Sequence, residues 1–288
     1  MWFYFAVFAA VTNAVATLAR RMHGSSSRPV ELAWWTQLLA IPFSAALLLT
    51  THQRFYVNHD FLLPGIASAA LCSFGCVLLF SAYKHGDASV ICPLTNLVPI
   101  GLLLSSFIMF GTKPPLTGLI GILFIAFGVY YTSVSGKHSL LQPFSAVWRQ
   151  RGSRAMLGCI VIWSVATNLD KIALRSTSPA FYLLFVQTIT FILLSMYMFA
   201  QPKRREGIVW RKWWKHMVVI SAFSTLSVFL QMKALSITSS SYVLAVKRLD
   251  TLIVILFAGI FLHERHILRR FKGSAIALLG VVVIYLVR

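Results

Sequence analysis

Apolar runs of about 20 residues recur along the whole chain, and short polar or basic stretches separate them. A run of this length crosses the hydrocarbon core of a bilayer as one α-helix. Only 11% of the residues are charged and the mean hydropathy is +0.78, whereas a soluble domain carries about 25% charged residues. The ten-residue alternating strands of a membrane β-barrel are not visible. The sequence therefore predicts an all-α polytopic membrane protein.

Windows of about 19 residues, bounded by charges and helix breakers, predict ten transmembrane helices. The expected spans are residues 2–19, 30–50, 62–82, 88–110, 116–135, 155–174, 179–200, 216–235, 240–262 and 270–287. The longest polar connection follows the fifth span. It predicts a first five-helix repeat at residues 1–135, a connecting loop at 136–153 and a second five-helix repeat at 154–288.

The two halves match each other at constant offsets, which indicates an internal repeat. At an offset of 150, Val15-Ala16-Thr17 meets Val165-Ala166-Thr167 and Gln37 meets Gln187; at 152, Leu97 meets Leu249, Gly121 meets Gly273 and Gly128 meets Gly280. Because each copy holds five helices, an odd number, the second copy must cross the membrane in the opposite sense. The prediction is two inverted repeats related by a pseudo-two-fold axis in the membrane plane, an architecture that secondary transporters use.

The basic residues concentrate on one side of the predicted membrane. Of the 26 Lys and Arg residues, 18 fall in the connections that follow the first, third, fifth, seventh and ninth helices. Short cytoplasmic loops are enriched in Lys and Arg, so both termini are expected outside the cytoplasm. The same distribution explains the net charge of +19 without nucleic acid as a partner.

The predicted helix at 240–262 carries Lys247, Arg248 and Asp250 near its middle. A charge at that depth costs about 2.5–3.5 kcal/mol on insertion scales, so such residues are kept where partners or a polar cavity compensate. One interpretation is a salt bridge from Lys247 to Asp250 or to Asp170. The other is that the basic pair binds a carboxylate or phosphate of a substrate. At the equivalent positions the first half has Thr95 and Asn96, which are polar but uncharged.

Further polar and aromatic side chains lie inside the apolar spans. Gln37 and Gln187 are equivalent residues, and each follows a proline by eight positions. Interhelical hydrogen bonding is the simpler account of such residues, but their symmetry makes them candidates for substrate binding. Tyr242 and Trp163 are aromatic candidates for the same site. Proton coupling needs a titratable group inside the membrane, and Asp250 and Asp170 are the candidates.

The end of each half resembles the EamA-type family of the drug/metabolite transporter superfamily. Leu262-His263-Glu264-Arg265 with Gly273 and Gly280 matches the family pattern in the second half, and Phe110-Gly111-Thr112-Lys113-Pro114 with Gly121 and Gly128 matches it in the first. The resemblance implies a ten-helix transporter with a central cavity between the repeats. Thr112 stands where the family usually has an acidic residue, and Gln37 and Gln187 where an arginine is common. Ten-helix relatives also commonly keep their termini in the cytoplasm, against the charge count.

The predicted function is a secondary active transporter in the cell (inner) membrane. Its substrate is expected to be a small polar metabolite, an amino acid or organic anion, that bears a carboxylate and crosses by alternating access. The alternative is a flippase for a phosphate-bearing, lipid-linked substrate. No nucleophile–base pair, metal-ligand spacing or phosphate-binding loop is present in the sequence, so we expect no enzymatic activity, metal or cofactor.

Overall fold

The computed structural model describes residues 1–21, 29–51, 58–85, 94–111, 116–133, 150–200 and 210–262, with 272–273, 275–276, 279–280 and 283. These residues form helices, and none of them forms an extended strand. The helices are α1 (Trp2–Arg21), α2 (Pro29–Thr50), η1 (His59–Phe61), α3 (Leu62–His85), η2 (Thr95–Leu97), α5 (Val98–Phe110), α6 (Leu116–Ser133), α8 (Arg151–Ala173), α9 (Pro179–Phe199), α10 (Trp210–Leu235), α11 (Ser240–Lys247) and α12 (Leu249–Leu262).

Six helices of the described part are long and apolar enough to cross a bilayer, namely α1, α2, α3, α8, α9 and α10. The apolar helices in α5 and α6 are shorter. Most of the predicted tenth span, 270–287, lies outside the described residues, so the count of ten stays a prediction. α10 begins at Trp210 rather than at residue 216, because the expected boundary excluded the basic residues that the structure places in its first turns.

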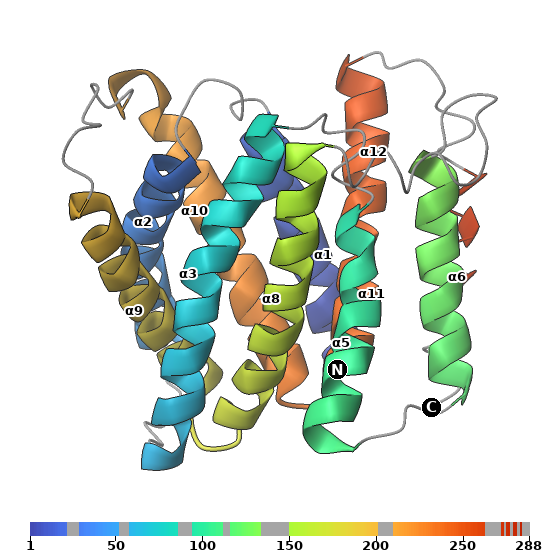
Figure 1. Ribbon diagram of the computed structural model, residues 1–288, viewed down its shortest axis with the longest axis horizontal. Coiled ribbons are helices and arrows are strands. Elements are labelled where there is room, and N and C mark those ends of the chain that lie inside the picture. The colour runs from blue at the N-terminus through green and yellow to red at the C-terminus, as the bar shows by residue number, and fades with distance from the viewer. Residues whose placement is uncertain are drawn as a thin grey trace.

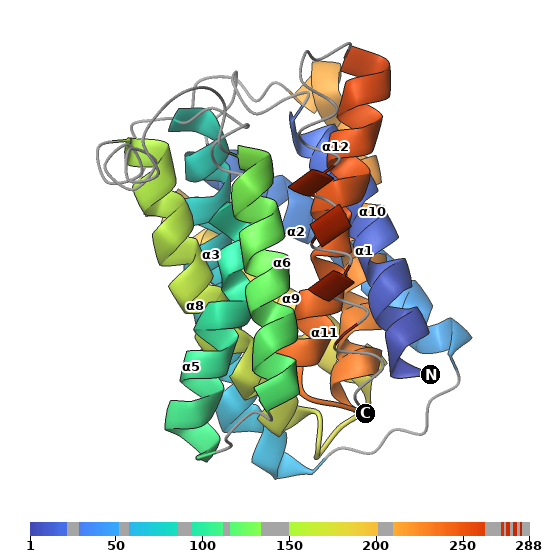
Figure 2. The ribbon, with the colours of Figure 1, turned by 90° about the vertical axis from the view of Figure 1, so that its right-hand side faces the viewer.

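The packing of the helices follows the internal repeat. α1 packs against α10, α11 and α12, while its equivalent in the second half, α8, packs against α3 and α5. The first helix of each copy therefore contacts the third and fourth helices of the other copy. α2 also packs against its own equivalent, α9. Figures 1 and 2 show that α1 and α8 run in opposite directions, as equivalent helices of two inverted repeats do.

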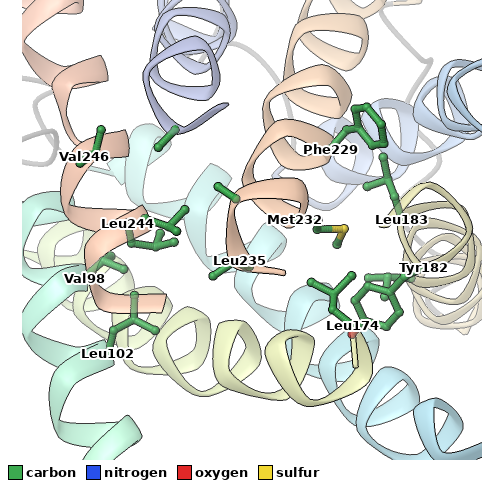
Figure 3. Close-up of a cluster of buried hydrophobic side chains, with 14 of the residues drawn as sticks. Val98, Leu102, Leu174, Tyr182, Leu183, Phe229, Met232, Leu235, Leu244 and Val246 are labelled. Carbon is green, nitrogen blue, oxygen red and sulfur yellow. The ribbon is translucent and has the colours of Figure 1, made fainter. Parts of the chain in front are cut away.

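One end of the bundle is filled by apolar side chains. Figure 3 shows this cluster where α8 and α10 end and α9 and α11 begin. Leu174, Tyr182, Leu235 and Leu244 belong to it, and each is at most 7% exposed. Buried apolar side chains therefore pack together where these helix ends meet.

Buried hydrogen bonds join helices of different copies. Asn168 in α8 accepts hydrogen bonds at Oδ1 from Ser106 of α5 (2.9 Å) and Ser240 of α11 (2.8 Å). Its Nδ2 donates to Ser105 at 2.8 Å. Small polar residues of this kind hold transmembrane helices together, at about 0.6 kcal/mol for an average bond.

The predicted continuous helix at 240–262 is wrong in one respect, since α11 ends at Lys247 and α12 begins at Leu249. The Thr251 amide donates to the Arg248 carbonyl at 3.1 Å, a three-residue step in place of the α-helical four. The equivalent segment of the first copy, Thr95–Leu97, is a 3₁₀ turn. Irregular backbone at membrane depth is tolerated where protein or a cavity surrounds it. Both interruptions therefore point to the region between the copies.

Gly280 lies against α6 so closely that no side chain fits there. A Cβ at this position would be 2.5 Å from the Gly121 carbonyl oxygen and 2.8 Å from the Ile125 amide nitrogen. Backbone atoms cannot rotate away, so Gly280→Leu should lower the free energy of unfolding by about 1–3 kcal/mol. Thermal unfolding in detergent measures this effect. Gly158→Ala is the control, because its nearest neighbour is the flexible Leu78 Cδ1 at 3.3 Å; an equal loss in both variants would contradict the close packing of Gly280.

Candidate functional site

A cavity of about 240 Å³ lies between the two copies. Side chains from α1, α2, α3, α8, α9, α10, α11 and α12 line it, together with residues near the start of α5. Its charged members are Arg20, Asp170, Lys247, Arg248 and Asp250. The helix interruption at Arg248 and the 3₁₀ turn at Thr95 both reach this cavity, which accounts for irregular backbone at this depth.

Lys247 and Arg248 both line the cavity, and each is 7% exposed. The Lys247 ammonium donates to Gln231 Oε1 at 2.6 Å. The Nε of Arg248 is buried and has no hydrogen-bond partner. Buried polar groups are normally hydrogen-bonded, so this nitrogen is an exception among the side chains around the cavity.

Asp250 is held by uncharged donors. Asn13 Nδ2 of α1 donates to its Oδ2 at 2.5 Å, and Thr251 Oγ1 donates to its Oδ1 at 3.3 Å. Among the described residues, Lys247 forms an ion pair with neither Asp250 nor Asp170. The structure therefore does not contain the salt bridge from Lys247 to Asp250 or Asp170 that the sequence suggested as one interpretation. Helical spacing puts Lys247 and Asp250 on one face, but the interruption at Arg248 changes that geometry.

Asp170, which also lines the cavity, is likewise held by uncharged donors. Ser68 Oγ of α3 donates to Asp170 Oδ1 at 2.5 Å, and the Tyr182 hydroxyl of α9 donates to the same oxygen at 2.8 Å. Asp170 is 7% exposed and Tyr182 is fully buried. This carboxylate joins the two copies, since α3 belongs to the first and α8 and α9 to the second.

Arg20 is a cavity residue that the sequence reasoning missed. Its position beside Arg21, just after the first predicted span, indicates a basic loop, but it lies in the last turn of α1 and donates to Ser224 of α10. A signal was present, because the offset of 150 puts Arg20 opposite Asp170. The equivalent positions of the two copies thus carry opposite charges, and both face the cavity.

Gln37 and Gln187 line the cavity from α2 and α9. Gln187 Nε2 donates to Thr225 Oγ1 at 3.3 Å, and Gln37 Nε2 donates to Cys76 Sγ at 3.6 Å. The Oε1 atoms of both glutamines are buried without a hydrogen-bond partner. Interhelical bonding therefore uses only one side of each amide.

The remaining predicted residues divide into three cases. Thr95 and Trp163 line the cavity. Tyr242 does not, because its hydroxyl lies against Gly118 of α6, 2.5 Å from where a Cβ would stand. The side chain of Asn96 lies outside the described residues. Hydroxyl residues that sequence reasoning did not single out also line the wall: Thr17, Thr36, Thr167, Thr190, Ser221 and Ser224.

Comparison with known proteins identifies a family whose model matches this chain. The model of the EamA-like transporter family matches residues 1–134 and again 150–286. No curated protein sequence matches the chain. A solved structure described only as "Crystal structure of protein" has a TM-score of 0.72 and 15% sequence identity, covering 99% of this chain and 96% of its own. At this identity the likeness concerns the fold alone.

Proposed function

Because the chain belongs to the EamA-like transporter family, we propose that this integral membrane protein is a secondary transporter for a small, carboxylate-bearing metabolite, an amino acid or organic anion. The observation that carries the proposal is the charge arrangement of the cavity. Arg20, Lys247 and Arg248 face it, whereas Asp170 and Asp250 accept hydrogen bonds from uncharged donors. Alternating access would come from one copy rocking against the other around this site.

Electrostatics supports an anionic substrate. Three cations and two acids line one buried cavity, and none of these cations forms an ion pair with Asp170 or Asp250 in the described part of the chain. A buried charge without a partner is unfavourable by several kcal/mol. A substrate carboxylate supplies the missing negative charge and accepts hydrogen bonds from Arg248 and Lys247. Binding of an anion is therefore favoured.

The size of the cavity favours a metabolite over a lipid. Sites for drug-sized ligands occupy about 300–1,000 Å³, and this cavity has about 240 Å³. A phosphate-bearing, lipid-linked substrate would use the same cations for its head group. Its acyl or prenyl chains would not fit in a cavity of this volume. We therefore favour the small metabolite over the flippase.

For orientation we propose the cell (inner) membrane with both termini outside the cytoplasm. The excess of Lys and Arg in alternate connections supports this assignment. Arg20 leaves that count because it faces the cavity, but the remaining excess is still large. The packed end of the bundle then faces outward, since α9 and α11 begin there.

Ligand-dependent thermal stability tests the proposed substrate class. A ligand that binds only the folded state stabilises it by about 2.7 kcal/mol at one hundred times its Kd. We expect amino acids or organic anions to raise the unfolding temperature of the detergent-solubilised protein. Neutral sugars and choline, matched for size, serve as controls. Stabilisation by these compounds without any by carboxylates would overturn the proposal.

A further inference from the structure

Resting on the proposed function, we propose that Asn13 is a positioning residue of the anion site, and that it holds the Asp250 carboxylate away from Lys247. The lysine then keeps its positive charge for the substrate instead of losing it to an ion pair within the protein. Asn13 acts through Asp250 and Lys247 rather than on the substrate itself. The contacts around the junction of α11 and α12 carry this inference.

The junction separates two opposite charges that are three residues apart. Lys247 is in the last turn of α11, and Asp250 is in the first turn of α12. In a continuous helix, residues at this spacing are neighbours on one face, and a lysine and an aspartate there attract each other. Here each charge lies at the helix end whose dipole favours it, the cation at a C-terminus and the acid at an N-terminus. The interruption thus compensates both charges without joining them.

Two neighbouring helices supply an uncharged partner to each of these groups. Asn13 Nδ2 of α1 donates to Asp250 Oδ2 at 2.5 Å, and Lys247 Nζ donates to Gln231 Oε1 of α10 at 2.6 Å. α1 packs against α11 and α12, and α10 packs against α11. Lys247, Asp250 and Gln231 are each at most 8% exposed, so little water competes for these bonds. Without the Asn13 amide, a buried carboxylate loses its donor and is drawn to the cation three residues away.

The internal repeat supplies an independent comparison. Its offsets of 150 and 152 place Trp163 opposite Asn13, Leu79 opposite Gln231, Thr95 opposite Lys247 and Val98 opposite Asp250. Where the charges are missing, both amide partners are therefore missing as well. Polar residues in transmembrane helices commonly serve to hold helices together, but that role gives no reason for amides and charges to occur together. This correspondence supports a role of the amides toward the charges.

A double-mutant cycle on anion binding tests the inference. We would measure the affinity of the detergent-solubilised protein for propionate, succinate and glutamate by calorimetry. Asn13→Leu keeps the size of the side chain and removes the donor, so it should lower the affinity about tenfold, the size expected when the anion loses a hydrogen bond to a charged group. In the D250N background no carboxylate is left to pair with Lys247. The same substitution should then change the affinity by less than about twofold, as for independent sites.

Thr12→Val is the matched control. Thr12 is a buried neighbour in α1 whose hydroxyl donates to the Phe8 and Ala9 carbonyls of its own helix, and it does not line the cavity. This variant should leave the affinity unchanged. Asn13→Ala is measured in parallel with Asn13→Leu, because alanine cannot overpack the site. An equal loss of affinity with and without D250N would show a purely structural role and overturn the inference.

A measurement without ligand separates this inference from the proposed function. In the wild type, Lys247→Met and Asp250→Asn should shift the unfolding temperature almost additively, because the two groups bond to Gln231 and Asn13 instead of each other. In the Asn13→Leu protein the two groups pair, so the coupling between the substitutions should grow by about 2–4 °C. An unchanged coupling would contradict the role of Asn13. Failure of all three carboxylates to bind would contradict the proposed function.

Discussion

A variant in which methionine replaces both Lys247 and Arg248 is expected to fold and to lose uptake in reconstituted vesicles. Methionine removes two buried charges, and apolar replacement of buried ionic groups is often neutral or stabilising. The ligand loses hydrogen bonds to two cations, each worth about 1.5–3 kcal/mol. Affinity for a carboxylate that stabilises the wild type should therefore fall by about a hundredfold or more.

The measurement is uptake of that carboxylate by vesicles, together with its effect on thermal unfolding. Lys171→Met is a matched control, since the Lys171 ammonium donates to the Thr238 carbonyl at 2.9 Å and does not line the cavity. The control should keep both uptake and ligand stabilisation. Unchanged transport by the double variant would contradict the proposal that Lys247 and Arg248 bind the substrate anion.

Asp250→Asn is expected to bind the anion more tightly than the wild type. Asp250 lines the same cavity as Lys247 and Arg248, and the substitution removes a negative charge that repels an anionic substrate. A repulsion of about 1–3 kcal/mol, typical of like charges near each other at an effective dielectric constant of 20, corresponds to a gain of about ten- to a hundredfold in affinity.

Calorimetry on the detergent-solubilised protein measures this affinity. The asparagine carbonyl can still accept from Asn13, so the local hydrogen bond is kept. Asp170→Asn is the comparison, because its carbonyl still accepts from Ser68 and Tyr182. Unchanged or weaker anion binding in Asp250→Asn would contradict the expected repulsion between Asp250 and the substrate.

The membrane architecture could be predicted because it depends on local chain properties. A bilayer offers no hydrogen bonds to the backbone, so each apolar run of sufficient length must become a helix. The constant offsets between the halves then indicated a repeat, which the double match of the family model confirms. Lys247, Arg248, Asp250 and Asp170 were recognisable from sequence for the same reason, since a charge within an apolar run requires a polar environment.

Which of these groups meet each other was decided by tertiary structure. Lys247 bonds to Gln231 and Asp250 to Asn13, partners that are 16 and 237 residues away in sequence. Arg20 faces the cavity because α1 packs against α10, although its basic neighbours in the sequence suggested a loop. The interruption at Arg248 contains neither Gly nor Pro and left no local signal. Apolar length and charge burial are properties of a segment, whereas hydrogen-bond partners and cavity walls arise only when distant helices pack.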